Sequence, residues 1–337
     1  MTSLVIQTAF LGDVVLTTPL LEAVAGRHGP VDVITTPAAA PLVETHRAVR
    51  RVIPYDKHGK HRGLRSLVAL ARALRAERYE VAYVPHRSLR SALLAWLARV
   101  PKRVGFHDGW RMLYTDVRRR APSGHEIDRL LALADVEPRG ARPSLLATAP
   151  DRAAVDAFLR EHEIRGAFVV LAPGSIWGSK RWRHYPALAQ WLAQRAAIVT
   201  VGGPEDAALG DEIVRAVEGG GGRTQAVSAC GRLTLRQSAE VIRRAAVLVT
   251  NDSAPLHFAQ AVATPTVAIF GPTTPAFGFG PRGPSDRVVE VGGLPCRPCS
   301  AHGPPSCPLG HHLCMKSLTV EDVRLAIEET GALRRRD

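Results

Sequence analysis

The stretch LVIQTAFLGDVVLTTPLLEAV, residues 4–24, decides the fold because it passes from a strand directly into a helix. Apolar and β-branched residues predict a strand over residues 4–10, and an apolar helical pattern begins at Val14. A dinucleotide-binding domain would place G-x-G-x-x-G between them, with backbone N–H groups directed at a pyrophosphate. This turn instead ends at Asp13, whose carboxylate repels phosphate. We predict that Asp13 caps the helix and does not hold a nucleotide.

Short apolar strands alternate with longer helical segments along the whole chain. The pattern restarts at about residue 151, after the proline-rich stretch EPRGARPSLLATAP at 137–150. Strict alternation predicts parallel sheets with crossover helices. We therefore predict an α/β protein with two Rossmann-like, doubly wound parallel-sheet domains facing each other across a cleft. Their ranges are 1–150 and 151–318, and a last helix lies within 319–337 and packs back toward the first domain.

Charge is concentrated in one part of the chain. The net charge is +13, and residues 47–120 hold 19 Lys or Arg against 5 Asp or Glu. This surplus indicates an anionic partner, which could be a polyanionic substrate, a membrane surface or nucleic acid, or it is only a solvated arginine-rich surface. Nucleic acid is disfavoured because aromatic residues are 5% and no nucleic-acid-binding motif is present.

We find neither a membrane span nor a signal peptide in the sequence. The apolar run SALLAWLARV is short and contains Arg99, whereas a span needs roughly 18 apolar residues. No basic stretch precedes the first apolar residues, and Asp13 follows them closely, so they are not typical of a signal peptide. We expect a cytoplasmic protein.

The unusual polar and glycine-rich segments all follow predicted strands. They are GD at 12–13, APGS at 172–175, VGGPED at 201–206, TNDSAPLH at 250–257 and FGPTTP at 270–275. In an open parallel sheet, ligands bind beyond the carboxyl ends of the strands. We expect these segments to line such edges, and the edges of the two sheets to form one cleft.

Three of these segments, all in the second domain, suit a phosphate. Glycine and Ser175 let backbone N–H groups approach an anion, and Lys180 supplies a mobile cation. Asp252 and Ser253 begin a helix, where free N–H groups and the helix dipole attract phosphate; His257 follows one turn later. A polar loop and ordinary helix capping are the alternatives, because the Walker spacing is absent. Together the loops predict a site for a nucleoside diphosphate.

Five stretches resemble glycosyltransferase family 9, the heptosyltransferases of lipopolysaccharide core assembly. They are GDVVLTTPLLEAV, HEIDRLLALA, APGSIWGSKRW, TNDSAPLHFAQAVATPTVAIFGPT, and PCRPC with CPLGHHLCMK, in the family's order between residues 3 and 330. The resemblance implies a GT-B fold with the acceptor on the first domain and the nucleotide sugar on the second. It implies inverting, metal-independent transfer of heptose from ADP-L-glycero-D-manno-heptose to the lipopolysaccharide inner core.

Residues 84–106 and 179–185 are most similar to the family members whose acceptor is heptosyl-Kdo2-lipid A. Another acceptor or sugar within the family is the first alternative, and a non-enzymatic anion- or lipid-binding module is a remote one. A nucleotide-sugar epimerase or dehydrogenase is disfavoured because residues 7–14 lack G-x-G-x-x-G. The implied partners are the donor, an anionic acceptor and, peripherally, the inner membrane. Neither a cofactor nor nucleic acid is expected, and we expect a monomer.

The resemblance also assigns roles to individual residues. Asp13 takes the position of the catalytic base that accepts the proton of the acceptor hydroxyl. The positions implied for the donor are Ser175, Lys180, Gly203, Asp252, Ser253, Ala254 and His257. Candidate contacts with the anionic acceptor are Arg62, Arg65, Arg87, Arg90, Lys102 and Arg103, because arginine binds phosphate and carboxylate bidentately.

The chain departs from the family pattern at two positions. Ala254 stands where glycine is usual, and Arg183 stands where proline is usual. Alanine would hinder donor binding only if this residue needed a positive φ.

Four cysteines, Cys296, Cys299, Cys307 and Cys314, lie within 19 residues. Reduced structural thiols, structural zinc and a disulfide are the alternatives, and reduced thiols suit a reducing cytosol best. We predict no metal, because the second cysteine pair lacks C-x-x-C spacing. The segment HEIDR at 125–129 is not a zinc-protease motif, since Arg129 stands at the position of the second histidine.

Overall fold

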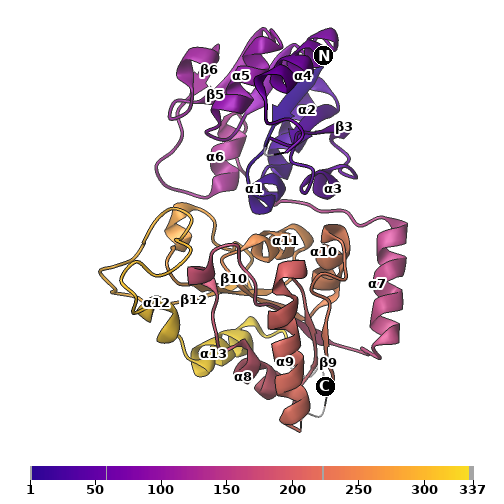
Figure 1. Cartoon of the computed structure of the whole chain (residues 1–337), viewed down its shortest axis with the longest axis vertical. Helices are drawn as coiled ribbons and strands as arrows, with labels where there is room; N and C mark the ends of the chain where they lie inside the picture. The colour runs from indigo at the N-terminus through magenta and orange to yellow at the C-terminus, as the bar shows by residue number, and fades with distance from the viewer. Residues whose placement is uncertain (1, 58, 222–223, 334–337) are drawn as a thin grey trace. The chain divides into compact units, whose positions relative to one another are not determined.

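The computed structural model describes residues 2–57, 59–221 and 224–333, and the chain divides into two compact units, Met1–Leu146 and Ala147–Asp337 (Figure 1). Each unit is a six-stranded parallel sheet with helices, so the predicted α/β class with two doubly wound sheets is confirmed. The units are described separately below.

The sheet of the first unit has the strand order β3-β2-β1-β4-β5-β6. The order reverses between β1 and β4, and a crevice forms at the carboxyl ends of the strands at such a switch point. The strands are β1 (Ser3–Ile6), β2 (Val31–Thr35), β3 (Val49–Pro54), β4 (Val81–Val84), β5 (Lys102–Phe106) and β6 (Asp116–Arg118). The helices are α1 (Leu11–Leu16), α2 (Thr18–His28), α3 (Ala40–Val43), α4 (Leu64–Ala76), α5 (Leu89–Leu97) and α6 (Glu126–Ala132), with a 3-10 turn η1 (Arg111–Leu113).

The second sheet repeats this topology, with the order β12-β11-β10-β7-β8-β9 and a reversal between β7 and β10. Its strands are β7 (Phe168–Ala172), β8 (Ala197–Thr200), β9 (Ala226–Ser228), β10 (Val247–Asn251), β11 (Thr266–Phe270) and β12 (Arg287–Glu290). Its helices are α7 (Ala149–Glu161), α8 (Tyr185–Leu192), α9 (Ala207–Gly219), α10 (Leu235–Arg244), α11 (Ala254–Val262), α12 (Leu313–Lys316) and α13 (Val320–Thr330), with 3-10 turns η2 (Gly178–Lys180), η3 (Pro204–Asp206) and η4 (Pro275–Phe277).

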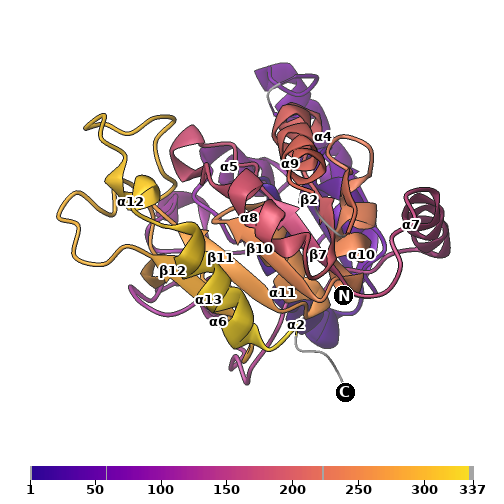
Figure 2. The ribbon, with the colours of Figure 1, turned by 90° about the horizontal axis from the view of Figure 1, so that it is seen from below.

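The last helix belongs to the second unit, and its predicted packing back toward the first unit stays a prediction. Figure 2 shows α13 alongside β11 and β12, and its contacts are with those strands and α8. The side chains of Val323 and Ile327 are fully buried in the same core as strands β7, β10 and β11. They are four residues apart, so one face of α13 is apolar and this sheet is the surface that buries it.

Central strands in both units are buried on both faces, as parallel sheets require. Every residue of β1, β2, β4, β7, β10 and β11 is buried. Among the described residues, no helix has the length and apolar character needed to cross a membrane. In contrast to these buried strands, the residues that follow them at the carboxyl edges of the sheets include polar ones.

Candidate functional site

Asp13 lies inside α1 and not at its N-cap, so the predicted position of the cap was wrong. The helix begins at Leu11, three residues earlier than expected, and Phe10 occupies the N-cap. The carboxylate of Asp13 accepts a hydrogen bond of 3.2 Å from the backbone N–H of Phe10. This is the reach-back half of a capping box, which holds the carboxylate just beyond the carboxyl end of β1.

The surroundings of Asp13 favour its protonated form. Burial raises its pKa to about 6, and the negative charge of Glu126 acts in the same direction. The N–H of Phe10 and the positive charge of Arg120 lower the pKa by smaller amounts. A carboxylate with a pKa near neutrality is a far better proton acceptor than an ordinary aspartate, because its basicity approaches that of histidine.

Glu126 and Arg120 are functional candidates that the sequence reasoning missed. Glu126 is the first residue of α6 and is buried, and it accepts hydrogen bonds from Arg120 and from Arg129, the latter at 3.4 Å. His125 is the N-cap and accepts from Ile127 N–H at 3.2 Å. The signal was present in HEIDR, where a glutamate and an arginine three residues apart begin an apolar helix. Neither the resemblance of this segment to the family nor its comparison with a zinc motif assigns a role to Glu126.

A second polar cluster lies at the switch point of the first sheet. The Nζ of Lys57 donates to the carbonyl of Thr8 at 2.8 Å, and the Thr8 hydroxyl lies 3.1 Å from Nε2 of His86. Burial and the charge of Lys57 lower the pKa of His86 to about 4. The imidazole is therefore neutral at physiological pH, and Lys57 supplies the positive charge beside the end of β1.

The six arginines and lysines predicted for the acceptor fall into different places. Arg90 holds a loop together, because its guanidinium donates to Tyr55 OH, Arg62 O and His61 O. Arg87 forms an ion pair with Asp108. Arg62 and Arg65, at the start of α4, are exposed, and their guanidinium groups make no ion pair or hydrogen bond within the described parts of the chain.

Lys102 and Arg103 lie at the opposite edge of the sheet from Asp13. They begin β5, whereas Asp13 follows the end of β1. Lys102 is 3.6 Å from Asp116, and Arg103 donates to the carbonyls of Leu113 and Val100. The strand direction thus separates this pair from Arg62 and Arg65, which lie at the start of the helix after β3.

Lys180 and Asp252 form a nearly buried ion pair at the switch point of the second sheet. The Nζ of Lys180 lies 2.6 Å from Oδ2 of Asp252 and donates to the carbonyl of Asp252 at 3.3 Å. Thr273 donates its hydroxyl to the same Oδ2 at 2.6 Å. Two of the segments singled out in the sequence, at 250–257 and 270–275, therefore meet at one carboxylate together with Lys180. Asp252 positions the lysine, and Thr273 is the partner that sequence reasoning missed.

Asn251 joins the loops around this pair. Its side-chain amide donates to Pro173 O at 2.8 Å, and its carbonyl accepts from Trp182 N–H at 3.2 Å. Asn251 is fully buried at the end of β10. It ties both ends of the loop between β7 and α8, which carries Lys180, to the end of β10, so it fixes the backbone around the ion pair. The sequence could have indicated this role, because Asn251 is a polar residue at the end of a mostly apolar strand.

The start of α11 lacks a capping side chain, so a phosphate bound there would not compete with one. Ser253 is the N-cap, but its hydroxyl accepts no hydrogen bond from the first turn. Ala254 is the first helical residue and is not among the residues with positive φ, so replacing the usual glycine introduces no backbone strain. His257 is buried, with Nδ1 3.0 Å from Gln260 Oε1, and burial lowers its pKa. It is neutral at physiological pH.

Ser175 and Gly203 lie in two loops that follow β7 and β8, beside the carboxylate of Asp206. Ser175 accepts a hydrogen bond from Trp177 N–H at 3.3 Å. The N–H of Gly203 donates to Asp206 at 3.2 Å, and a Cβ on Gly174 would lie 2.2 Å from the Asp206 carboxyl group. Only glycine at position 174 leaves room for this buried carboxylate, whose pKa burial raises.

The cysteine-containing segment packs on the loop that carries Lys180. Nε2 of His312 lies 2.7 Å from Ser179 O, the Ser179 hydroxyl donates to Pro304 O, and Cys299 N–H donates to Pro272 O at 2.8 Å. All five cysteines are free thiols. Within the described ranges, no cluster of three or more histidine, cysteine or acidic side chains is arranged to hold a metal. The segment braces the candidate donor loops.

Two six-stranded, doubly wound parallel sheets on one chain are typical of the GT-B class of glycosyltransferases. The model of glycosyltransferase family 9 (heptosyltransferase) matches residues 67–306, and the chain belongs to this family. It is therefore a glycosyltransferase.

Individual relatives match along most of the chain. Lipooligosaccharide heptosyltransferase 2 of Haemophilus influenzae is 29% identical, with 82% of this chain and 85% of the relative covered. Lipopolysaccharide heptosyltransferase 2 of Escherichia coli is 28% identical, with 86% and 87% covered. The solved structure of the E. coli ADP-heptose LPS heptosyltransferase II superposes with a TM-score of 0.79, at 25% identity and with 98% of each chain covered.

Proposed function

We propose that this protein transfers heptose from ADP-L-glycero-D-manno-heptose to the inner core of lipopolysaccharide, with heptosyl-Kdo2-lipid A as acceptor. The reaction inverts the anomeric centre and needs no metal ion. The protein works at the cytoplasmic side of the inner membrane, in peripheral contact with it. The relatives that match along most of the chain are named heptosyltransferase 2, which supports this choice of acceptor.

The observation that carries the mechanism is the raised pKa of Asp13 at the switch point of the first sheet. As the acceptor oxygen attacks C1 of the heptose, its proton passes to the carboxylate of Asp13. The bond between C1 and the phosphate oxygen breaks at the same time, and its electron pair leaves with ADP. Lys57, Arg62 and Arg65 lie at or beyond the carboxyl edge of the same sheet and provide positive charge for the anionic acceptor.

The second unit stabilises the departing diphosphate. Lys180 pairs with Asp252, the residue before the N-cap of α11, and the N–H groups and dipole of this helix favour negative charge. Asp252 and Thr273 hold Lys180 in place before the donor binds, so little reorganisation is needed as charge develops. Ser175, Gly203, Ala254 and His257 complete the proposed donor site.

The reaction is tested by incubating the protein with ADP-heptose and either Kdo2-lipid A or heptosyl-Kdo2-lipid A, and measuring ADP release and the lipid product. We expect ADP release only with the heptosylated acceptor, at a rate that a chelator does not change. Product from Kdo2-lipid A alone would instead assign the activity of the first heptosyltransferase. Loss of activity on chelation, restored by a divalent ion, would contradict the metal-independent mechanism.

The acidic limb of the pH profile should depend on Glu126. Asp13 acts as a base only when it is ionised, so kcat/KM should fall as the pH drops below about 6. The variant Glu126→Gln removes a negative charge that raises the pKa of Asp13, so the limb should move to lower pH. Measuring kcat/KM between pH 4.5 and 8 tests this prediction.

The matched control for this experiment is Glu80→Gln, which removes an exposed glutamate of the same unit. The control should leave the limb at its wild-type position. A limb that is unchanged in Glu126→Gln, or that moves to higher pH, would show that Glu126 does not set the basicity of Asp13.

A further inference from the structure

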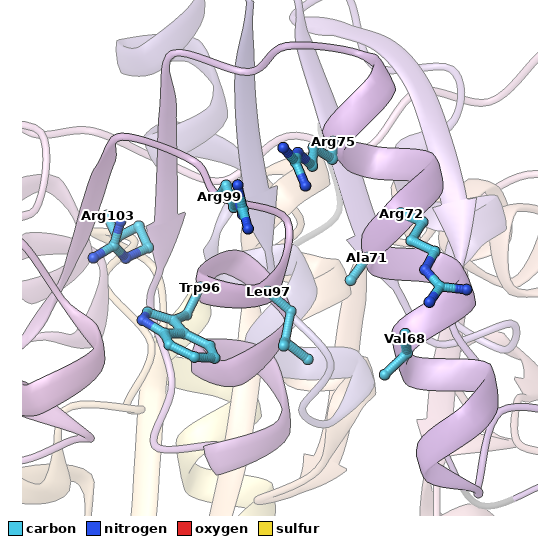
Figure 3. A pocket seen from close by; sticks show the side chains of 8 residues that line it. All are labelled: Val68, Ala71, Arg72, Arg75, Trp96, Leu97, Arg99 and Arg103. Carbon is cyan, nitrogen blue, oxygen red and sulfur yellow. The ribbon is translucent and has the colours of Figure 1, made fainter.

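A groove of about 520 Å³ lies between α4 and α5, on the helical layer that covers the first sheet (Figure 3). Figure 3 shows Val68 of α4 and Leu97 of α5 extending into the gap between the two helices, and Arg75 directed toward Arg99. The groove therefore has an apolar interior and basic groups along its rim. Its lining residues are Val68, Ala71, Arg72, Arg75, Trp96, Leu97, Arg99 and Arg103.

The positive charge around the groove is largely uncompensated. Arg72, Arg75 and Arg99 are exposed, and in the described part of the chain their guanidinium groups make no ion pair or hydrogen bond. No acidic residue occurs in the ranges 64–76 and 87–107, which contain both helices. Arg75 and Arg99 also lie near helix C-termini, where positive charge is favourable. Stabilising a helix C-terminus does not explain why these arginines line a groove next to an exposed tryptophan.

Exposed apolar side chains accompany these arginines. Trp96 is 48% exposed on the rim of the groove, Leu64 at the start of α4 is 73% exposed, and Met112 of η1, which contacts α5, is 97% exposed. Tryptophan beside arginine is typical of surfaces that lie in a membrane interface, because the indole ring suits the boundary between headgroups and acyl chains.

The groove is separate from the proposed site of transfer. Arg103 is the second residue of β5 and lies near the amino edge of the sheet, whereas Asp13 follows the carboxyl end of β1. An occupant of the groove therefore does not compete with the acceptor for Asp13. Arg72, Arg75 and Arg99 are also not among the residues that we assign to the acceptor.

We propose that the α4–α5 groove binds the phosphate of an anionic phospholipid and docks the protein on a membrane surface. The guanidinium groups of Arg72, Arg75 and Arg99 contact the phosphodiester, and Trp96 lies at the level of the glycerol and first acyl carbons. This site specifies the membrane contact in the proposed function and is independent of the transfer chemistry.

Binding to vesicles of phosphatidylglycerol and phosphatidylethanolamine, measured by co-sedimentation of the full chain, tests this site. Each basic residue near an anionic membrane contributes roughly a fivefold increase in affinity, so Arg72→Gln/Arg75→Gln should weaken binding roughly 25-fold. The control Arg183→Gln/Arg215→Gln removes two exposed arginines of the second unit and should bind as the wild type does. Thermal unfolding of all three proteins checks that folding is unchanged.

Tryptophan fluorescence places the contact at the groove. Vesicles should shift the emission of the wild type to the blue, and the variant Trp96→Phe should lose this shift. Equal vesicle binding by wild type and Arg72→Gln/Arg75→Gln would overturn the proposal. Stabilisation by inorganic phosphate or a short RNA, without vesicle binding, would also overturn it and assign the groove to a soluble anion. Transfer to a detergent-solubilised acceptor should be unchanged in the groove variants, which separates this result from failure of the proposed function.

Discussion

Replacing Asp13 by asparagine should abolish transfer and at the same time stabilise the folded protein at neutral pH. Loss of a general base lowers kcat by roughly 10²- to 10⁴-fold. Asparagine retains an oxygen that can accept the N–H of Phe10, so the start of α1 is preserved. The variant therefore removes the charge and the basicity of residue 13 with little change in local structure.

The stability gain follows from the raised pKa. The folded protein holds Asp13 at a pKa of about 6, above the value of 3.8 that the group has when exposed. The wild type consequently loses stability as the pH rises from about 4 to 6, because the ionised form is disfavoured only in the folded state. The variant has no such loss, so its free energy of unfolding should exceed that of the wild type by about 1–3 kcal/mol above pH 6.

Denaturant unfolding at pH 4 and pH 7.5, together with the rate of ADP release, checks both parts of this prediction. The two proteins should be equally stable at pH 4 and differ at pH 7.5. Glu80→Gln, the exposed control, should change neither stability nor activity. A rate above a tenth of wild type in Asp13→Asn would rule out Asp13 as the base, and equal stability at pH 7.5 would contradict its burial.

Replacing Lys180 by methionine should cause the second large loss of activity. Removing one preorganised group that stabilises a leaving group typically lowers kcat by roughly 10²- to 10³-fold. The same change leaves Asp252 nearly buried without its cation, which costs about 3–5 kcal/mol of stability for a buried pair. Activity of the single variant is therefore measured well below its melting temperature.

The double variant Lys180→Met/Asp252→Asn separates catalysis from folding. It removes both charges, so stability should recover toward the wild-type value while transfer stays lost. Arg183→Gln, three residues further along the same loop and exposed, is the control and should keep its activity. Recovery of transfer in the double variant would show that Lys180 acts only as the partner of Asp252.

Local patterns in the sequence were enough to predict much of the fold. The alternation of strands and helices predicted both sheets, and the strand-end rule located the segments at residues 172, 250 and 270, two of which meet at the Lys180–Asp252 pair through Asp252 and Thr273. The start of α1 was misplaced because Asp13 acts from the third helical position. Propensity alone does not distinguish an N-cap aspartate from one that reaches back to the N-cap N–H.

The predicted acceptor residues show the limit of such patterns. The sequence shows that residues 47–120 are basic, but it does not show that Arg90 holds a loop or that Lys102 lies at the opposite edge of the sheet from Asp13. An arginine whose guanidinium makes three internal hydrogen bonds and an arginine whose guanidinium is unpaired look identical in the sequence. Only the folded chain distinguishes them.

The sequence by itself determined the two-sheet architecture and the family, and it placed Asp13 and Lys180 after the first strand of each sheet, because periodicity and strand-end chemistry are encoded within a few neighbouring residues. Tertiary structure alone decided how these residues behave. Glu126 acts on Asp13 from more than a hundred residues away, and Asp252 pairs with Lys180 across 72 residues. Burial and ion pairing depend on what the fold brings together, and these two effects set the charge of a carboxylate and the position of a lysine.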